Sequence, residues 1–317
     1  MILNRLYLYY KKKGSASLIS AVKTKFKLYL NDRKIASHYF FYGGVGDNTV
    51  LRIELERWKC YNKLKKKYQR FLDELPFYEP SGIKNKTIWW CWLQGEENAP
   101  ALCKSCLISL KKQFPDYKIV VITEENMFDF VHPPQYIIEK FHKGIIGRAH
   151  FADLLRTMLL VEYGGVWIDS TVYCTGYHEK IFDEPLFVFK NCQLAGFPTT
   201  VASNWLISSE KDHPILRTMQ DLLFLYWKEN NNLIHYFFYH MFFHMVTEKY
   251  HDLWRLVPCY SNIPPHYLQH ELLKPYCDKL STRIKLQSDF HKLSHKINTE
   301  GLETNNLVVD KIINNQF

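Results

Sequence analysis

The feature that most constrains the fold is an alternation of strand and helix patterns that begins near residue 87. The stretch TIWWCWLQ (87–94) has the character of a buried strand, and ALCKSCLISLKKQF (101–114) that of an amphipathic helix. DYKIVVITEEN (116–126) then predicts a second strand. A strand, a helix and a strand at this spacing form a βαβ unit, so we expect an α/β fold with a parallel sheet and a right-handed crossover.

A second helix and strand follow and end at an aspartate. The helix is predicted from Gly147 to Tyr163 and stops at a glycine pair, as a glycine-capped helix does. The short apolar strand VWI then leads directly to Asp169. Ligands bind beyond the carboxyl ends of such strands, and a buried unpaired carboxylate would be costly. We therefore expect Asp169 to meet a metal, a ribose hydroxyl or a base; a capping or turn aspartate is the alternative.

Charge is concentrated at the N-terminus. Residues 1–70 hold 17 Lys and Arg against four acids, a local charge of +13, whereas the whole chain carries +9, so the remainder carries −4. Basic helices with interspersed aromatic residues can lie on an anionic membrane. The alternative is a solvated helical face packed on the body of the protein. No nucleic-acid-binding motif accompanies the charge, so nucleic acid is not an expected partner.

The composition indicates a folded chain in two parts. The 317 residues are 47% hydrophobic and 23% charged, which is enough to bury a core. Residues 1–80 look helical, and the stretch 78–86 has the Pro, Gly and polar content of a linker. We therefore expect a basic helical segment over 1–84 and an α/β domain over 85–317.

The location of the protein follows from two absences in the sequence. No run of about 18 apolar residues is present, so we expect no membrane-spanning helix. The eight cysteines are scattered, which is not typical of a disulfide-stapled secreted domain and indicates a reducing cytoplasm. Together with the basic segment, this predicts a cytoplasmic protein held peripherally on the inner face of the cell membrane.

One stretch carries a resemblance to a known family. YGGVWIDST resembles the region around the metal-binding D-x-D motif of retaining glycosyltransferases of the GT-A type. It is most similar to glycosyltransferase family 32 and to its sub-branch of capsular polysaccharide synthesis proteins. TIWWCWLQG, RAHFADLLRTMLLVEYGG, ASNWLISS and DFHKLSHK resemble further family motifs in the same order. Together these stretches span about residues 87–296.

The resemblance implies a fold and an activity. The fold would be a GT-A-like, Rossmann-type, mainly parallel sheet flanked by helices. The activity would be transfer of a hexosyl residue, with retention, from a nucleoside-diphosphate sugar such as a UDP-sugar. The acceptor would be a hydroxyl of an oligosaccharide or a lipid-linked, growing surface or capsular polysaccharide. The alternative is a non-catalytic, membrane-peripheral assembly factor with a degenerate transferase fold. A nucleotidyl- or phosphotransferase would show a Gly-rich phosphate loop or a second nearby carboxylate, and neither is evident.

The resemblance also assigns site residues. Trp92 would stack on the nucleotide base, and Asp153 and Arg156 would contact the donor sugar and ribose-phosphate. The spacing of Asp153 and Arg156 places both on one face of their helix. Asp153, Arg156 and Asp169 form the predicted catalytic set. The predicted donor-binding residues are Trp92, Asp153, Arg156, Asp169, Ser170, Asn204 and Lys292.

The sequence departs from the family at the metal motif. The pattern has a second carboxylate two residues after the first, but this chain has Thr171 there. We expect a divalent cation, Mn²⁺ or Mg²⁺, held by Asp169, Thr171 and His291. Lys292 would neutralise the departing nucleoside diphosphate.

Two further patterns are interpreted as packing. Cys103 and Cys106 lie three positions apart on a predicted helix without a second pair, which favours buried thiols over a zinc site. His240 and His244 lie on one face of an aromatic-rich helical stretch that lacks the glutamate of HExxH. Core packing is the default interpretation of that stretch, and lining of an acceptor cleft is the alternative.

Overall fold

The computed structural model describes residues 49–177, 180–191, 199–297 and 306–317. The helices expected before residue 49 lie outside this part of the chain. Within it, no helix is both long and apolar enough to cross a membrane.

Residue contacts divide the chain into the units Met1–Glu56 and Arg57–Phe317. The second unit contains the sheet and the helices that cover it. It also includes residues 57–84, which the sequence analysis assigns to the N-terminal segment.

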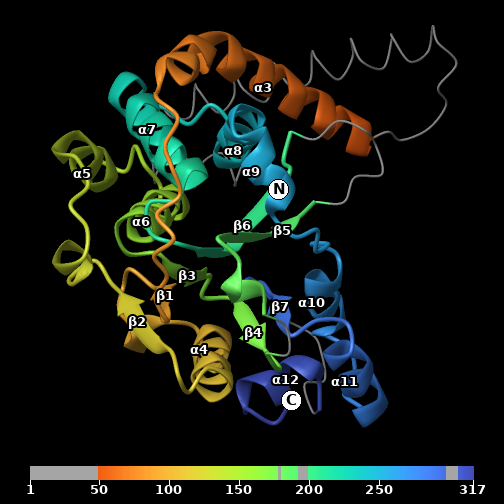
Figure 1. The fold of residues 1–317 in the computed structure, drawn as a ribbon. Coiled ribbons are helices and arrows are strands. Elements are labelled where there is room, and N and C mark those ends of the chain that lie inside the picture. The colour runs from red at the N-terminus through yellow and green to blue at the C-terminus, as the bar shows by residue number, and fades with distance from the viewer. Residues whose placement is uncertain (1–48, 178–179, 192–198, 298–305) are drawn as a thin grey trace, which may run out of the picture. The chain divides into compact units, whose positions relative to one another are not determined.

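A five-stranded sheet forms the centre of the fold (Figure 1). Its strands, in spatial order, are β2 (Lys118–Ile122), β1 (Thr87–Cys91), β3 (Gly165–Ile168), β6 (Ala202–Ser209) and β5 (Leu186–Lys190). β1 pairs in parallel with both β2 and β3, whereas β6 runs antiparallel to both β3 and β5. Four of the five strands therefore point the same way, which confirms the predicted α/β fold with a mainly parallel sheet.

Helices cover both faces of the sheet. The helices of the described residues are α3 (Thr49–Glu74), α4 (Ala101–Gln113), α5 (Gln135–His142), α6 (Arg148–Tyr163), α7 (Pro214–Glu229), α8 (Phe238–Lys249), α9 (His251–Leu256), α10 (Tyr267–Glu271), α11 (Asp278–Lys285) and α12 (Val308–Ile313). Short 3₁₀ helices span Glu96–Asn98, Met127–Asp129, Ile181–Asp183 and Pro264–His266. In Figure 1, α6, α7 and α8 lie on one side of the sheet and α4 on the other.

The strand sequences explain why both faces are covered. Side chains alternate between the faces of a strand, so Trp89 of β1 belongs to the core with α6, α7 and α8, whereas Trp90 packs with α4. Trp167 and Val166 of β3 divide in the same way. A strand that is apolar on both sides needs a helix layer over each face, which is the architecture of parallel sheets.

The glycine pair before β3 is required by the close approach of β3 to β1. Gly164 and Gly165 have φ angles of +70° and +93°. A Cβ atom at Gly165 would lie 2.5 Å from the carbonyl oxygen of Thr87 in β1. Glycine therefore serves both the left-handed turn that ends α6 and the pairing of β3 with β1.

A two-stranded antiparallel sheet lies beside the central one. β4 (Val172–Cys174) pairs with β7 (Phe290–Lys292), and Val172 is opposite Lys292. The backbone amide of Leu293 also donates to the carbonyl of Thr171. This pairing brings a segment near the C-terminus to the residues that follow β3.

The helix α3 packs on the body through one stripe of side chains, hereafter the buried stripe of α3. This stripe comprises Tyr61, Leu64, Tyr68 and Leu72. The hydroxyl of Tyr61 donates to Glu248 of α8 at 3.0 Å, and that of Tyr68 to Glu229 of α7 at 3.2 Å.

The two cysteines of α4, Cys103 and Cys106, are fully buried free thiols, which confirms their interpretation as packing residues.

His213 caps the N-terminus of α7 with a neutral ring. Its Nδ1 accepts a hydrogen bond from the amide of Ile215 at 3.3 Å, and the side chain is 3% exposed. Burial lowers the pKa of His213 to about 4. Below its ordinary pKa near 6.5, the unfolded chain therefore binds a proton that the folded chain does not, and stability falls as the pH falls.

We expect this one residue to cost about 2 kcal/mol of unfolding free energy between pH 7 and pH 5. Replacement His213→Asn keeps an N-cap acceptor without a titratable ring, so the variant loses less stability over this interval. Urea unfolding at both pH values measures the difference, with the exposed His251→Asn as control. Identical pH slopes for the wild type and His213→Asn would contradict the assignment.

Candidate functional site

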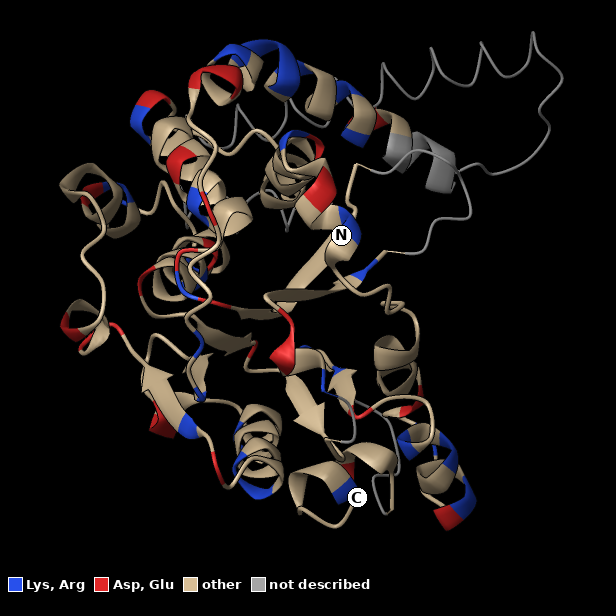
Figure 2. Ribbon diagram, in the orientation of Figure 1, with Lys and Arg blue, Asp and Glu red and all other residues tan. Residues whose placement is uncertain are grey.

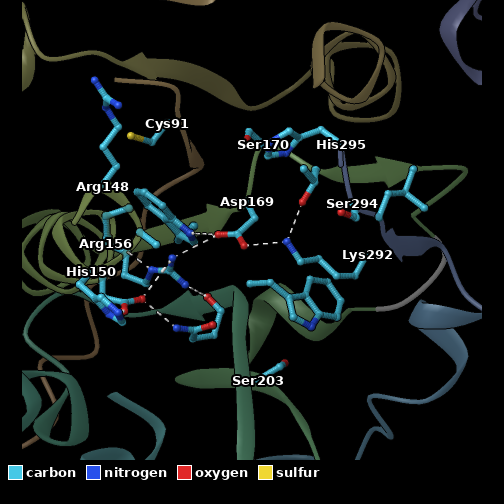
Figure 3. Close-up of a pocket in the computed structure, with 18 of the residues that line it drawn as sticks. Cys91, Arg148, His150, Arg156, Asp169, Ser170, Ser203, Lys292, Ser294 and His295 are labelled. Atoms are coloured by element: carbon cyan, nitrogen blue, oxygen red, sulfur yellow. Dashed lines mark hydrogen bonds and ion pairs between the residues drawn. The ribbon is translucent and has the colours of Figure 1, made fainter. Parts of the chain in front are cut away.

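A cavity of about 870 Å³ opens at the carboxyl ends of β1 and β3. Its wall comes from distant parts of the chain: the ends of β1 and β3, the first half of α6, β6, the start of α8, and the segment after β7. Figure 3 shows the side chains of Arg156 and Lys292 meeting at Asp169. This is the edge at which ligands bind in sheets of this kind.

Asp169 is held between two cations. Its Oδ1 accepts from Nε1 of Trp167 at 2.9 Å and lies 3.3 Å from Nη2 of Arg156. Its Oδ2 lies 2.9 Å from Nζ of Lys292 (Figure 3). Burial alone would raise the pKa of Asp169, but the ammonium of Lys292 and the guanidinium of Arg156 outweigh it, and the pKa lies below its usual range. The carboxylate is therefore ionised at neutral pH.

Arg156 links the carboxylate of Asp169 to that of Asp153. The guanidinium Nη2 lies 3.4 Å from Oδ1 of Asp153, and Nη1 donates to the backbone carbonyl of Asn204. Its Cζ lies 4.9 Å from the centre of the Trp167 ring, a cation–π contact. Burial acts to lower the pKa of Arg156, but Asp169 and Asp153 outweigh it and raise the pKa above its ordinary value.

Asp153 is fixed by its other partners. Nδ2 of Asn204 donates to its Oδ1 at 2.9 Å, and Nδ1 of His150 lies 3.3 Å from its Oδ2. Asp153 and Arg156 are only 6% and 5% exposed. The predicted residues Asp153, Arg156, Asp169 and Asn204 thus form one network, although their contact with a donor stays a prediction.

Trp92 stands at the rim of the cavity just beyond β1. Its amide donates to the carbonyl of Ile122 at 3.0 Å, and its ring meets that of His295 edge to face at 5.6 Å between centroids. The ring Nε1 is buried without a hydrogen-bond partner among the described residues. An indole in this position offers a flat apolar face to a bound molecule.

The structure separates His291 from the other predicted site residues. Consecutive residues of β7 point to opposite sides, so Lys292 enters the cavity while His291 points into the core. His291 is fully buried and its Nε2 lies 3.0 Å from Oγ1 of Thr175. Burial lowers the pKa of His291 to about 3. His291 thus contacts Thr175 and does not line the cavity, and its role as a metal ligand stays a prediction.

Among the described residues, the side chains next to Asp169 do not fit a divalent cation. Mg²⁺ and Mn²⁺ favour several oxygen ligands, carboxylates above all. Here Ser170 and Thr171 supply only hydroxyls, and both oxygens of Asp169 already contact cationic side chains. Among the described residues, no cluster of three His, Cys, Asp or Glu side chains is arranged to hold a metal.

The cavity also contains polar residues that were not predicted from the sequence. Those near the network are Arg148, His150, Ser203, Ser294, His295 and Lys296. His150 stands three positions before Asp153 on the same helix face, a spacing that could have identified it. The segment after β7 carries the other signal, since Lys292, His295 and Lys296 all belong to the DFHKLSHK stretch.

The aromatic-rich stretch that contains His240 and His244 forms α8 and the turn before it. Phe238 and Phe242 lie in the core, whereas Tyr236, Phe237 and His240 line the cavity. Burial lowers the pKa of His240 to about 4, so its imidazole is neutral at physiological pH. The stretch therefore serves both the core and the cavity wall.

Comparisons with known proteins agree with the motifs. The model of a family described as "Capsular polysaccharide synthesis protein" matches residues 48–312, which confirms the resemblance noted in the sequence. Inositol phosphoceramide mannosyltransferase 1 of Schizosaccharomyces pombe is 23% identical over 125 residues, or 38% of this chain and 37% of that protein. The chain thus aligns with about a third of the length of this relative.

A solved structure also resembles the chain weakly. The PaToxG glycosyltransferase shares 15% identity and covers 83% of this chain and 95% of its own, with a TM-score of 0.38. A score at this level is too low to establish a common fold. The α/β architecture therefore rests on the strand order and directions described above.

Proposed function

The chain belongs to the capsular polysaccharide synthesis protein family, and from that premise we propose that it is a glycosyltransferase. It takes a hexosyl residue from a nucleoside-diphosphate sugar, in particular a UDP-sugar, and transfers it to a growing capsular or surface polysaccharide. The observation that carries the proposal is the meeting of Asp169, Arg156 and Lys292 in a cavity at the carboxyl ends of parallel strands. The relative named as a mannosyltransferase supports the same class of reaction.

The proposed reaction exchanges one bond to the anomeric carbon for another. The bond between that carbon and the diphosphate oxygen breaks, and its electron pair stays on the diphosphate. A hydroxyl oxygen of the acceptor forms the new bond and gives its proton to the departing phosphate oxygen. Attack from the same face as the leaving group would retain the anomeric configuration and needs no protein nucleophile. The protein contributes positioning and stabilisation of the developing negative charge.

Individual residues have distinct parts in this proposal. Trp92 stacks on the nucleotide base at the rim. Asp153 accepts hydrogen bonds from sugar hydroxyls, and the amide of Asn204 can donate to them or accept from them. Arg156 and Lys292 supply positive charge beside the diphosphate. Tyr236 and Phe237, on the α8 side of the cavity, offer aromatic faces to the sugar rings of an oligosaccharide or lipid-linked acceptor.

We also propose that α3 holds the enzyme on an anionic membrane, on the inner face of the cell membrane. Figure 2 shows Lys and Arg along this helix. The exposed residues Lys59, Lys63, Lys66 and Arg70 recur at helical spacing and form one stripe. With 3.6 residues per turn, this stripe lies opposite the buried stripe of α3, so it faces away from the body. Each cation near an anionic surface contributes about 1 kcal/mol.

Thermal unfolding in the presence of nucleotides tests the donor assignment. We expect one of UDP, GDP and CMP, or its sugar conjugate, to stabilise the protein in buffers with Mn²⁺, Mg²⁺ or EDTA. At a hundredfold excess over its dissociation constant, the ligand adds about 2.7 kcal/mol. Trp92→Ala should weaken the binding of this ligand by up to about tenfold, whereas replacement of the exposed Trp58 by Ala should leave it unchanged.

The same experiment separates the enzyme from a non-catalytic assembly factor. Thr171 in place of a second carboxylate is the observation that favours such a factor. That alternative predicts binding to lipid or partner without stabilisation by any nucleotide. Absence of a shift with every nucleotide and sugar would remove the transferase proposal.

A further inference from the structure

Lys292 contacts the first and third residues of the D-x-D-like sequence. Its Nζ lies 2.9 Å from Oδ2 of Asp169 and 2.6 Å from Oγ1 of Thr171 (Figure 3). These two side chains stand at the first and third positions of the motif-like sequence Asp-Ser-Thr. The ammonium thus contacts both residues that stand where the motif has its two carboxylates in sequence.

The pairing of β7 with β4 determines where Lys292 enters the cavity. Lys292 is opposite Val172 in the pairing of β7 with β4, and the amide of Leu293 donates to the carbonyl of Thr171 at 2.9 Å. Lys292 therefore enters the cavity next to Thr171 as a consequence of strand register. A shift of the register by one residue would exchange it for the buried His291.

The net charge of the cavity is positive, so the cavity can bind an anion in the absence of a metal ion. Its described lining contains four lysine and arginine side chains, Arg148, Arg156, Lys292 and Lys296, against the two carboxylates Asp153 and Asp169. The formal excess is therefore two positive charges. A nucleoside-diphosphate sugar carries one negative charge on each phosphate, so the cavity and the ligand balance.

We propose that Lys292 replaces the divalent cation in this cavity, so that the nucleoside diphosphate binds and leaves without a metal. This inference rests on the proposed function. The ammonium neutralises the diphosphate on binding and stabilises the oxygen that gains the electron pair when the glycosidic bond breaks. Asp169 and Thr171 act as positioning residues for Lys292, and the chain needs no second carboxylate after Asp169.

Isothermal titration of the full chain with UDP and GDP, in EDTA and in Mn²⁺, tests the proposal. We expect the wild type to bind its nucleotide with the same affinity in both buffers. Lys292→Met keeps the length of the side chain but removes its charge, and it should weaken binding in EDTA roughly tenfold to a hundredfold. Lys292→Arg should retain most of the affinity. Lys279→Ala, which removes an exposed lysine of α11, should bind as the wild type does.

The possible results distinguish a failure of this inference from a failure of the proposed function. Nucleotide binding that appears only with Mn²⁺ and disappears in EDTA would overturn the replacement of the metal and leave the transferase proposal standing. Unchanged affinity of Lys292→Met in EDTA would do the same. Absence of binding by either nucleotide in both buffers would overturn the two together. Circular dichroism of each variant establishes that it is folded.

Discussion

Replacement of Asp169 by Asn is expected to lower sugar transfer by roughly a hundredfold to a thousandfold, the effect of losing a charge-positioning group at a developing anion. The carboxylate is the shared partner of Arg156 and Lys292. An amide of the same shape carries no charge, so it neutralises neither cation and weakens the contact that joins them. Consumption of the nucleotide sugar, followed by the release of nucleoside diphosphate, measures the loss.

A matched variant shows whether the effect is local. Asp116 is an exposed aspartate in the turn before β2, and Asp116→Asn should transfer sugar as the wild type does. Full turnover by a folded Asp169→Asn would show that the carboxylate has no part in the reaction. Transfer lost equally in both variants would indicate a general defect of the preparations.

Replacement of Arg156 by Ala is expected to cost about 3–5 kcal/mol of unfolding free energy, because it leaves buried carboxylates without their cation. Arg156 is 5% exposed and contacts both Asp153 and Asp169. Arg156→Lys keeps the charge but not the planar fork, so it should recover only part of the loss. Urea unfolding at neutral pH measures these differences.

The pH dependence identifies the cause of this destabilisation. In the wild type, the pKa of Asp169 is lowered, so its contribution is complete above the unfolded value near 3.9 and is lost as the pH falls through the folded value. In Arg156→Ala, the remaining carboxylates take up protons at higher pH. The defect should therefore shrink on acidification. A defect of the same size at every pH would indicate lost packing, and the exposed Arg255→Ala serves as control.

The central βαβ unit and the position of Asp169 were predictable because their signals are local. The strands β1, β2 and β3 and the helices α4 and α6 lie where hydrophobic periodicity places them. The glycine pair ends α6 and permits the contact with β1, so the residue after β3 had to reach the ligand edge of the sheet. Asp153 and Arg156 follow from the same helix, since a spacing of three positions gives one face.

β6 was not predictable in the same way. The stretch ASNWLISS was identified as a family motif rather than as a strand. Its insertion between β3 and β5 makes the sheet mixed and delivers Asn204 to Asp153. Antiparallel placement of a strand between two others depends on long-range pairing, for which periodicity within the segment carries no information.

The sequence by itself determined the sheet class, the glycine-capped entry to β3, and the carboxylate at its end, because each depends on residues a few positions apart. Only the tertiary structure decided which cation meets that carboxylate. Lys292 lies 123 positions from Asp169, and the register of β7 against β4 turns it into the cavity while His291 is buried. Strand alternation makes neighbouring residues point to opposite sides, and the partner strand alone fixes which of them faces the site.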